Sequence, residues 1–222
     1  LKDSPHHPVE IPDPNMACVF AHAVRGGQSL IPKRLSKGDR HTKIIDLDAN
    51  NLYGFGMSGN PPVDDFKWED QTVIFDAFAD PLAYLDKLKE EGRGCFLMGD
   101  FHIPREIHEM THDYPFMPEK CCVPEAALSD KQRELNTNNR TTHNPRQEYL
   151  LQTMWDKTGY VVYGPMLEFY LKHGVQLTHI WCIITFNVAR WLKPYIELNT
   201  ALRNEAKRLG NALGIVVYKG MN

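Results

Sequence analysis

Two carboxylates spaced two residues apart, with a turn directly after them, are the most chemically suggestive feature of the chain. Residues 46–58 read DLDANNLYGFGMS, and Asp46 and Asp48 close an apolar run. Negatively charged oxygens are the ligands that Mg²⁺ prefers. The same carboxylates would also serve at the end of a buried strand, accepting hydrogen bonds from turn amides. The pattern alone therefore leaves a metal site and an ordinary turn both open.

A second candidate for metal chemistry is HEMTH at 108–112, which fits the HExxH pattern of zinc peptidases. That chemistry needs two histidines on one helix face and a glutamate as general base. Pro104 and the DYP segment at 113–115 confine any helix here to about one turn. No third ligand follows at a standard spacing. We therefore favour surface histidines in a loop or short helix and keep a zinc metallopeptidase as a remote alternative.

The elements that would position the carboxylates follow from local patterns. In TKIIDLDA (42–49), Ile45 and Leu47 alternate with the two aspartates, which predicts a strand with both carboxylates on one face. LYGFGMS is expected to begin a helix, although its two glycines weaken it. GNPPVDDF predicts a loop. MACVFAHAV (16–24) predicts a short buried element.

The rest of the chain mixes helices and strands without strict alternation, so an α+β fold is expected. Asp80 as N-cap, Pro81 in the first turn and Gly92 as a stop predict one helix. The segment 113–147 is rich in proline and polar residues and predicts a long loop or a mobile insert. Three apolar runs predict strands: GCFLMGDFHIP, GYVVYG and VQLTHIWCIITF. PMLEFYLKHG predicts a helix, and so does the segment from Trp191 to about Leu213. In the latter helix, Arg203 and Lys207 share one side, and another side is apolar and carries Leu198, Leu202, Ala206, Leu209 and Leu213.

Composition limits the class of protein. The chain has 222 residues, of which 42% are hydrophobic and 24% charged, as in globular proteins with a real core. No apolar run approaches the ~20 residues that a membrane span needs. The polar, proline-rich start is not a signal peptide and suggests an internal cut from a longer protein.

Charge and cysteine content give weaker hints. Five cysteines without CxxC spacing indicate free thiols in a reducing, intracellular compartment. The net charge is −3, but basic residues gather at 25–43 and from residue 190 to the end. These two ends would form either a local phosphate-binding surface or two solvated basic faces.

The segment D-x-x-N-L-Y-G at 48–54 resembles the first catalytic motif of family B DNA polymerases, usually written D-x-x-S-L-Y-P. Its Asn-Asn-Leu-Tyr-Gly form resembles the protein-primed branch found in Maverick/Polinton elements and related viruses and plasmids. Other segments resemble further parts of that family, and they occur in the same order. RGG at 25–27 resembles its Tyr-x-Gly-Gly motif, and DYPFMPEK (113–120) resembles its DYPLAPEK-type stretch. FYLKHGVQLTHI (169–180) and WLKPYIELNTALR (191–203) resemble the segment that leads into the fingers, and YKGMN (218–222) resembles the opening of the second motif, K-x-x-x-N-S-x-Y-G.

The resemblance implies a palm-type sheet with flanking helices, an inserted subdomain and the start of helical fingers. It divides the chain into an N-terminal part of the palm (1–60), an insert with the return to the palm (61–188), and a fingers helix with the truncated second motif (189–222). Two departures stand out. GIVVY precedes Lys219 where relatives carry charged and aromatic residues, and Trp181-Cys182 replaces a basic pair.

The resemblance also implies roles for single residues. Phosphoryl transfer to a DNA 3′ end uses two Mg²⁺ ions ~3.5–4 Å apart. Asp48 would be the metal ligand of the first motif, and the Ala49 carbonyl a further ligand. Asp46 is left as a structural residue. The backbone of Asn51 and Leu52 would face the triphosphate, and Tyr53 would lie under the deoxyribose. Lys207 and Lys219 would neutralise the charge of the triphosphate. The residues that would contact template DNA are Arg25, Gly26, Gly27 and Arg34.

The expected partners are a DNA template-primer, a dNTP and a terminal protein bound through the insert at 61–150, in the nucleus or at a viral replication site. The third motif, with the second essential aspartate, is absent from this sequence. The 222-residue chain is therefore expected to be inactive alone. The alternative is a repurposed, non-catalytic module that binds DNA or protein.

Overall fold

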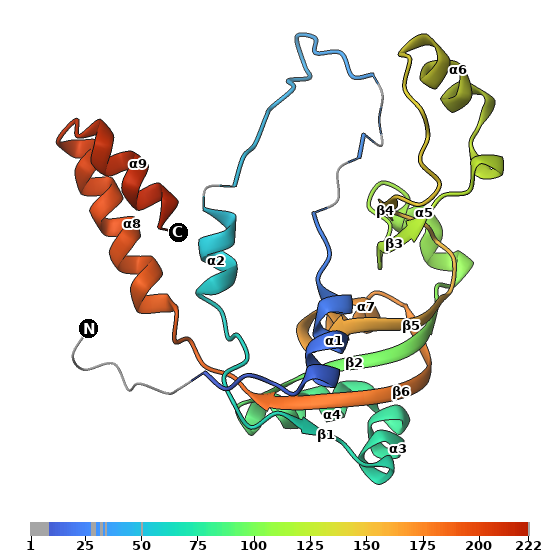
Figure 1. Cartoon of the computed structure of the whole chain (residues 1–222), viewed down its shortest axis with the longest axis vertical. Coiled ribbons are helices and arrows are strands. Elements are labelled where there is room, and N and C mark those ends of the chain that lie inside the picture. Colours follow the sequence, from blue (N-terminus) through green and yellow to red (C-terminus); the bar gives the residue numbers. More distant parts are fainter. Residues whose placement is uncertain (1–8, 28–29, 32, 34, 50, 222) are drawn as a thin grey trace. The chain divides into compact units, whose positions relative to one another are not determined.

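The computed structural model describes residues 9–27, 30–31, 33, 35–49 and 51–221. It has an α+β fold, as predicted, built on a four-stranded sheet (Figure 1). The strand order is β1-β6-β2-β5, with β1 antiparallel to β6 and β2 antiparallel to β5. The strands are β1 (Lys67–Trp68), β2 (Arg93–His102), β5 (Lys157–Tyr163) and β6 (Gln176–Asn187).

The chain is divided into two compact units, and each unit is discontinuous in sequence. The first comprises Leu1–Pro14, Ser36–Cys95 and Ile183–Asn222, and the second comprises Asn15–Leu35 and Phe96–Cys182. Strands β2 and β6 each contribute residues to both units. The functional division into 1–60, 61–188 and 189–222 stays a prediction.

In the first unit, side-chain caps define two consecutive helices, α3 (Gln71–Ala79) and α4 (Pro81–Glu90). Asp80 caps α4 by accepting a hydrogen bond from the Ala83 amide at 3.0 Å, and Gly92 ends the turn with a φ of 69°. This is the helix that the sequence predicted. Helix α3 was not predicted, although Asp70 caps it in the same way.

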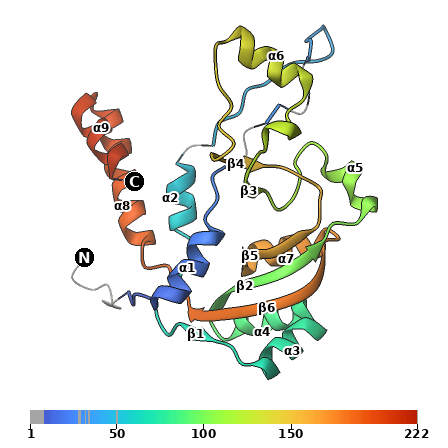
Figure 2. The same ribbon diagram turned by 45° about the vertical axis from the view of Figure 1, so that its right-hand side comes forward.

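The C-terminal part of the first unit is a helical hairpin of α8 (Lys193–Arg208) and α9 (Ala212–Gly220), which lie side by side (Figure 2). One helix from 191 to 213 was predicted, but Gly210, with a φ of 66°, allows the chain to turn there. The predicted apolar side was also wrong: Ala206 is buried, whereas Leu209 and Leu213 are 65% and 74% exposed. Ile196 and Asn199 are the other buried positions of α8.

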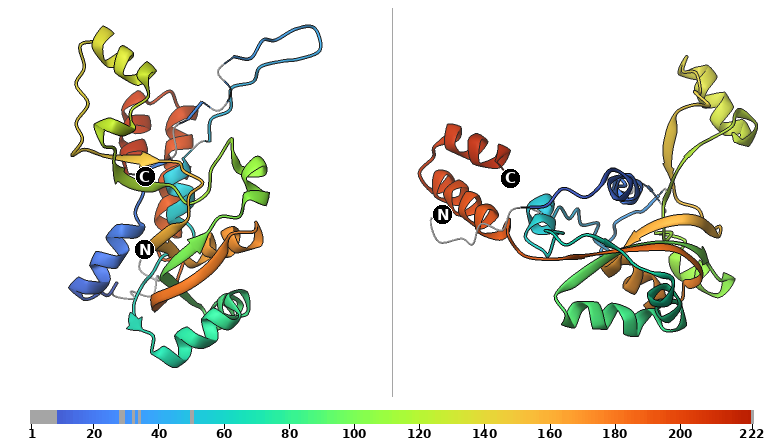
Figure 3. Two further views of the ribbon diagram at one scale, coloured as in Figure 1. Left: turned by 90° about the vertical axis from the view of Figure 1, so that its right-hand side faces the viewer. Right: turned by 60° about the horizontal axis from the view of Figure 1, so that its bottom comes forward.

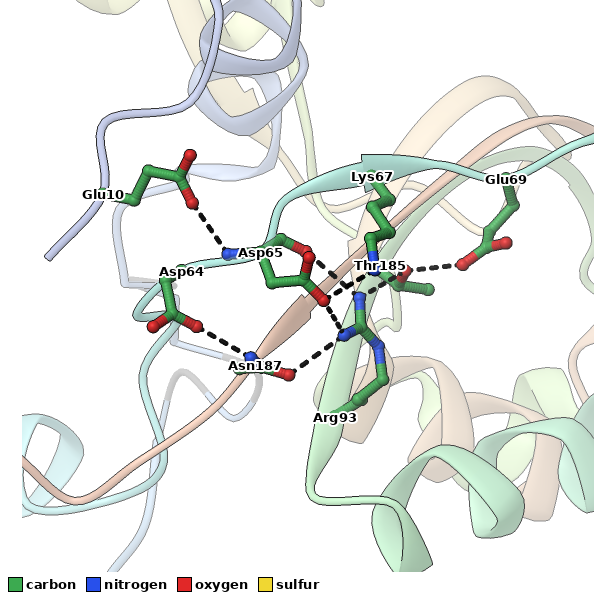
Figure 4. A network of polar contacts seen from close by, with 8 residues as sticks. All are labelled: Glu10, Asp64, Asp65, Lys67, Glu69, Arg93, Thr185 and Asn187. Atoms are coloured by element: carbon green, nitrogen blue, oxygen red, sulfur yellow. Dashed lines mark hydrogen bonds and ion pairs between the residues drawn. The ribbon is translucent and has the colours of Figure 1, made fainter. Parts of the chain in front are cut away.

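Arg93, at the start of β2, organises a polar network at one end of the sheet (Figure 4). Its guanidinium donates to the Asp65 carboxylate at 2.5 Å, to Asn187 Oδ1 at 3.0 Å and to Thr185 Oγ1 at 3.0 Å. It also donates to the Asp65 carbonyl at 3.1 Å. Thr185 in turn donates to Glu69. The network ties β2 to the end of β6 and to the segment that leads into β1.

The second unit combines the predicted strand β5 with α7 (Gly164–Lys172), which ends at His173-Gly174 as expected. Its core includes Leu97, Phe101 and Val162. Helix α1 (Pro14–Ala23) buries Met16 and packs Phe20 on Phe96 at 4.7 Å between ring centroids. The predicted buried element at 16–24 is therefore a helix that is largely exposed.

The segment 113–147 was predicted as a loop but contains regular structure. It holds β3 (Glu119–Cys122), paired with β4 (Glu148–Leu151), and helix α6 (Asp130–Asn138), which lies beyond these strands (Figure 3). A capping box between Ser129 and Gln132 starts α6, so a sequence signal for it was present. Three short helical turns complete the unit: Arg105–Ile107, α5 (His108–Thr111) and Glu125–Ala127.

The predicted strand at 42–49 does not form. Residues 42–49 have no regular secondary structure, and Ile45 and Leu47 are 72% and 87% exposed. A strand is stable only when its backbone groups pair with a neighbour. No described strand pairs with this segment. The strand prediction is therefore wrong: the sequence alternates apolar and acidic residues, but the pairing that a strand requires is not made within the described chain.

Candidate functional site

A cavity of about 680 Å³ in the first unit brings the NLYG motif beside the C-terminal hairpin. One wall comes from α2 (Leu52–Met57) and the residue before it, and the other from α8. The two helices are in contact and lie side by side (Figure 2). The lining residues are Asn51, Gly54, Phe55 and Ser58 on one side, and Ile196, Glu197, Thr200, Ala201, Arg203, Asn204 and Lys207 on the other.

The motif side of the cavity has a fixed local geometry. Asn51 adopts a left-handed conformation with a φ of 53°, which asparagine tolerates better than most residues. Its side chain lies directly over Gly54. A Cβ on Gly54 would approach Asn51 Nδ2 to 2.3 Å, so the Asn51 side chain would have to move to admit any other residue at position 54. Glycine at this position therefore leaves room for the Asn51 side chain within the turn.

The α8 side of the cavity carries positive charge. Arg203 and Lys207 are one helical turn apart and both line the cavity, as their spacing predicted. The Nε of Arg203 is buried and has no hydrogen-bond partner among the described residues. The acid in the lining, Glu197, is 3.6 Å from Lys193. A buried donor without a partner is rare, and the same arginine lines the cavity.

Arg203 was not predicted as a site residue. Lys207 was assigned because it lies twelve residues before Lys219, whereas Arg203 matched no motif position. Its position four residues before Lys207 was the signal that would have found it.

The other predicted residues of the motif do not line this cavity. Asp48 and Ala49 are exposed in the segment that precedes the turn. Leu52 and Tyr53 are 63% and 86% exposed. Lys219 is exposed near the end of α9. Of the predicted nucleotide-binding residues, the structure therefore brings Asn51 and Lys207 together.

The carboxylate of Asp48 and the carbonyl of Ala49 are oxygen donors of the kind that Mg²⁺ binds. Within the described part of the chain, however, no group of three or more His, Cys, Asp or Glu side chains is placed to hold a metal ion. These residues supply part of a donor set at most, and the two-metal site stays a prediction.

The predicted DNA-binding residues belong to the second unit. The Arg25 guanidinium stacks on Tyr160, 3.7 Å from the ring centroid, and its Nη1 donates to the Val161 carbonyl at 2.9 Å. Burial lowers the pKa of Arg25, while the nearby Tyr160 opposes that shift. Gly26 and Gly27 are exposed. Arg34 lies outside the described residues.

Arg25 also lines a cavity of about 360 Å³ within the second unit. The cavity lies between the end of α1, the β3–β4 pair and strand β5. Its charged lining residues are Arg25 and Lys120 on the basic side and Glu119 and Glu148 on the acidic side.

The histidines of HEMTH lie in and just after the single turn of α5. His108 Nε2 is 3.1 Å from the Ile103 carbonyl, and His112 Nδ1 is 2.7 Å from the Glu109 carbonyl. His112 Nε2 also pairs with Asp113 at 2.9 Å. Both side chains are thus engaged with protein oxygens, as expected for histidines of a short surface helix.

Among the described residues, no helix combines the length and apolar character of a membrane span. Comparison of the chain with protein-family models, curated proteins and solved structures gave no match.

Proposed function

We propose that the chain is the palm-to-fingers part of a protein-primed family B DNA polymerase, and that the cavity between α2 and α8 receives the triphosphate of a dNTP. The observation that carries the proposal is the Arg203 guanidinium, whose buried Nε has no partner among the described residues, in a cavity shared with Lys207 and the Asn51 turn. Two basic side chains and a donor without an acceptor suit a polyphosphate. The resemblance of residues 48–54 to the first polymerase motif agrees with this.

The mechanism that fits these residues is positioning and charge neutralisation. Arg203 and Lys207 would hold the phosphates from α8, and the Asn51 turn would present backbone N–H groups from the other wall. Mg²⁺, bound with the help of Asp48 and the Ala49 carbonyl, would supply the charge stabilisation that phosphoryl transfer needs. Template-directed dNMP addition is the reaction that this site would serve.

The test is a titration of the chain with a fluorescent dNTP in the presence of Mg²⁺. We expect Arg203→Ala and Lys207→Ala each to weaken binding by about tenfold, because each removes a charged donor. Arg208→Ala is the matched control: Arg208 is also on α8 but pairs with Glu205 and does not line the cavity. Equal effects of all three changes, or no binding by the unaltered chain, would contradict the proposal.

A second candidate is a non-catalytic module that binds protein, and the surface of α9 favours it. Leu213 and Val216 are 74% and 69% exposed, and Val217 is 46% exposed. Exposed apolar groups of this kind are typical of protein contacts. A chain that binds DNA or a protein partner but no dNTP would support this candidate over the polymerase.

A further inference from the structure

The four basic residues of helix α8 are Lys193, Arg203, Lys207 and Arg208. The outer two are paired with acids of the same helix: Lys193 lies 3.6 Å from Glu197, and Arg208 binds Glu205. The inner two, Arg203 and Lys207, have no ion-pair partner among the described residues. These inner two are the ones that line the cavity beside α2. The helix therefore presents its uncompensated positive charge to the cavity.

Arg203 and Lys207 also repel each other. Residues four positions apart lie one turn apart on the same helix face, and like charges at this spacing weaken a helix. Glu205 lies between them in the sequence but accepts hydrogen bonds from Arg208 instead. An anion held by both side chains would relieve this repulsion. The cavity is therefore suited to a ligand with several negative charges.

The lining is unfavourable for a divalent cation. Mg²⁺ prefers carboxylate oxygens, and Glu197 is the one acid among the described lining residues. Glu197 is already paired with Lys193. The expected metal ligands, Asp48 and Ala49, do not line the cavity. A metal ion at this place would add positive charge beside two uncompensated cations, so neutralisation of bound phosphates falls to the side chains of α8.

We infer that the α2–α8 cavity binds the polyphosphate chain itself, without a metal ion and whether or not a nucleoside is attached. The inference rests on the proposed function of this cavity, and it names the group that the cavity recognises. Tyr53, which the family resemblance places under the deoxyribose, is 86% exposed and lies outside the lining. Selection of the sugar is thus separate from this contact.

The experiment measures displacement of a fluorescent dNTP from the whole chain by sodium tripolyphosphate, in EDTA and again in Mg²⁺. Tripolyphosphate is expected to displace the probe in EDTA, at a concentration within about threefold of that needed for unlabelled dTTP or UTP. Thymidine, which carries no phosphate, should leave the probe bound.

Variants of α8 connect the displacement to the cavity. Arg203→Ala and Lys207→Ala should each raise the tripolyphosphate concentration needed in EDTA by about tenfold, because each removes a cation that no acid neutralises. Arg208→Ala is the matched control, since Arg208 is paired with Glu205 and lies outside the lining. Circular dichroism of each variant verifies the fold.

The failures of the two ideas are distinguishable. A probe that binds only in Mg²⁺ would overturn this inference while leaving dNTP binding intact, and so would displacement by thymidine but not by tripolyphosphate. A dNTP that binds in neither buffer, or equal effects of the three variants, would contradict the proposed function itself.

Discussion

Replacing Arg93 by alanine tests whether the polar network stabilises the end of the sheet that lies in the first unit. The Arg93 side chain is 15% exposed and makes four hydrogen bonds, two to Asp65 and one each to Asn187 and Thr185. The change removes these bonds together, along with the packing of the side-chain stem.

The expected cost follows from what each partner keeps. Asp65 retains Lys67 at 2.8 Å, Thr185 retains Glu69, and Asn187 retains Asp64 at 2.8 Å. No charge is left buried alone, so the cost is below the ~3–5 kcal/mol of a broken buried ion pair. Four hydrogen bonds of modest net value, discounted for these remaining contacts, give a loss of about 2–3 kcal/mol.

Urea unfolding followed by circular dichroism measures this loss, and a thermal scan should show the melting temperature falling by roughly 5–10 °C. Lys67→Ala is the matched control, because Lys67 binds the same carboxylate from a side chain that is 60% exposed. Its expected cost is below ~1 kcal/mol. Equal costs for the two variants, or less than ~1 kcal/mol for Arg93→Ala, would refute the assignment of Arg93 as the organising residue.

Acid pH gives an independent check on the same network. Hydrogen bonds from Lys67 and Arg93 lower the pKa of Asp65 in the folded state. The carboxylate therefore contributes stability above its unfolded pKa of ~3.9, and this contribution is lost as pH falls through the lower folded value. The difference in stability between the unaltered chain and Asp65→Asn should shrink below pH ~4.

Three further predictions concern single positions. Gly54→Ala should weaken dNTP binding less than Lys207→Ala in the same titration, because its Cβ would displace the Asn51 side chain that lines the cavity but would remove no charged group. Burial raises the pKa of Cys95 to about 12, so Cys95 should resist a thiol reagent at pH 8 until the chain unfolds, as mass spectrometry of labelled peptides would show. Glu119→Ala should cost about 3 kcal/mol in urea unfolding by leaving the buried Lys157 ammonium without its counterion, and adding Lys157→Met should recover most of that loss.

Elements with strong local signals could be predicted from the sequence. Helix α4 has its cap at Asp80 and its stop at Gly92, and strands β2, β5 and β6 are long apolar runs. The segment 42–49 has an equally clear alternation, but a strand also needs a partner, and partners are not local. Helix α6 was missed because the prolines and polar residues around it outweighed the Ser129 capping box.

The candidate site was only partly predictable for the same reason. Motif resemblance identified Asn51 and Lys207, and helical spacing placed Arg203 beside Lys207. The contact between α2 and α8 joins segments far apart in sequence, so the cavity that they line is visible only in three dimensions. Trp181 departs from the family pattern, and the hydrogen bond of its indole Nε1 depends on Asp100 from a neighbouring strand.

The pairing of β1 with β6 has a consequence for synthesis of the protein. Lys67 and Trp68 pair with Thr185 and Ile184, so β1 has no place in the sheet until that distant segment has left the ribosome. Pairing of β1 with β6 cannot occur until most of the second unit has been synthesised. Such non-local closure is slow and exposes the nascent chain to aggregation. The order of these strands in the chain thus makes closure of the β1–β6 edge a late step of folding.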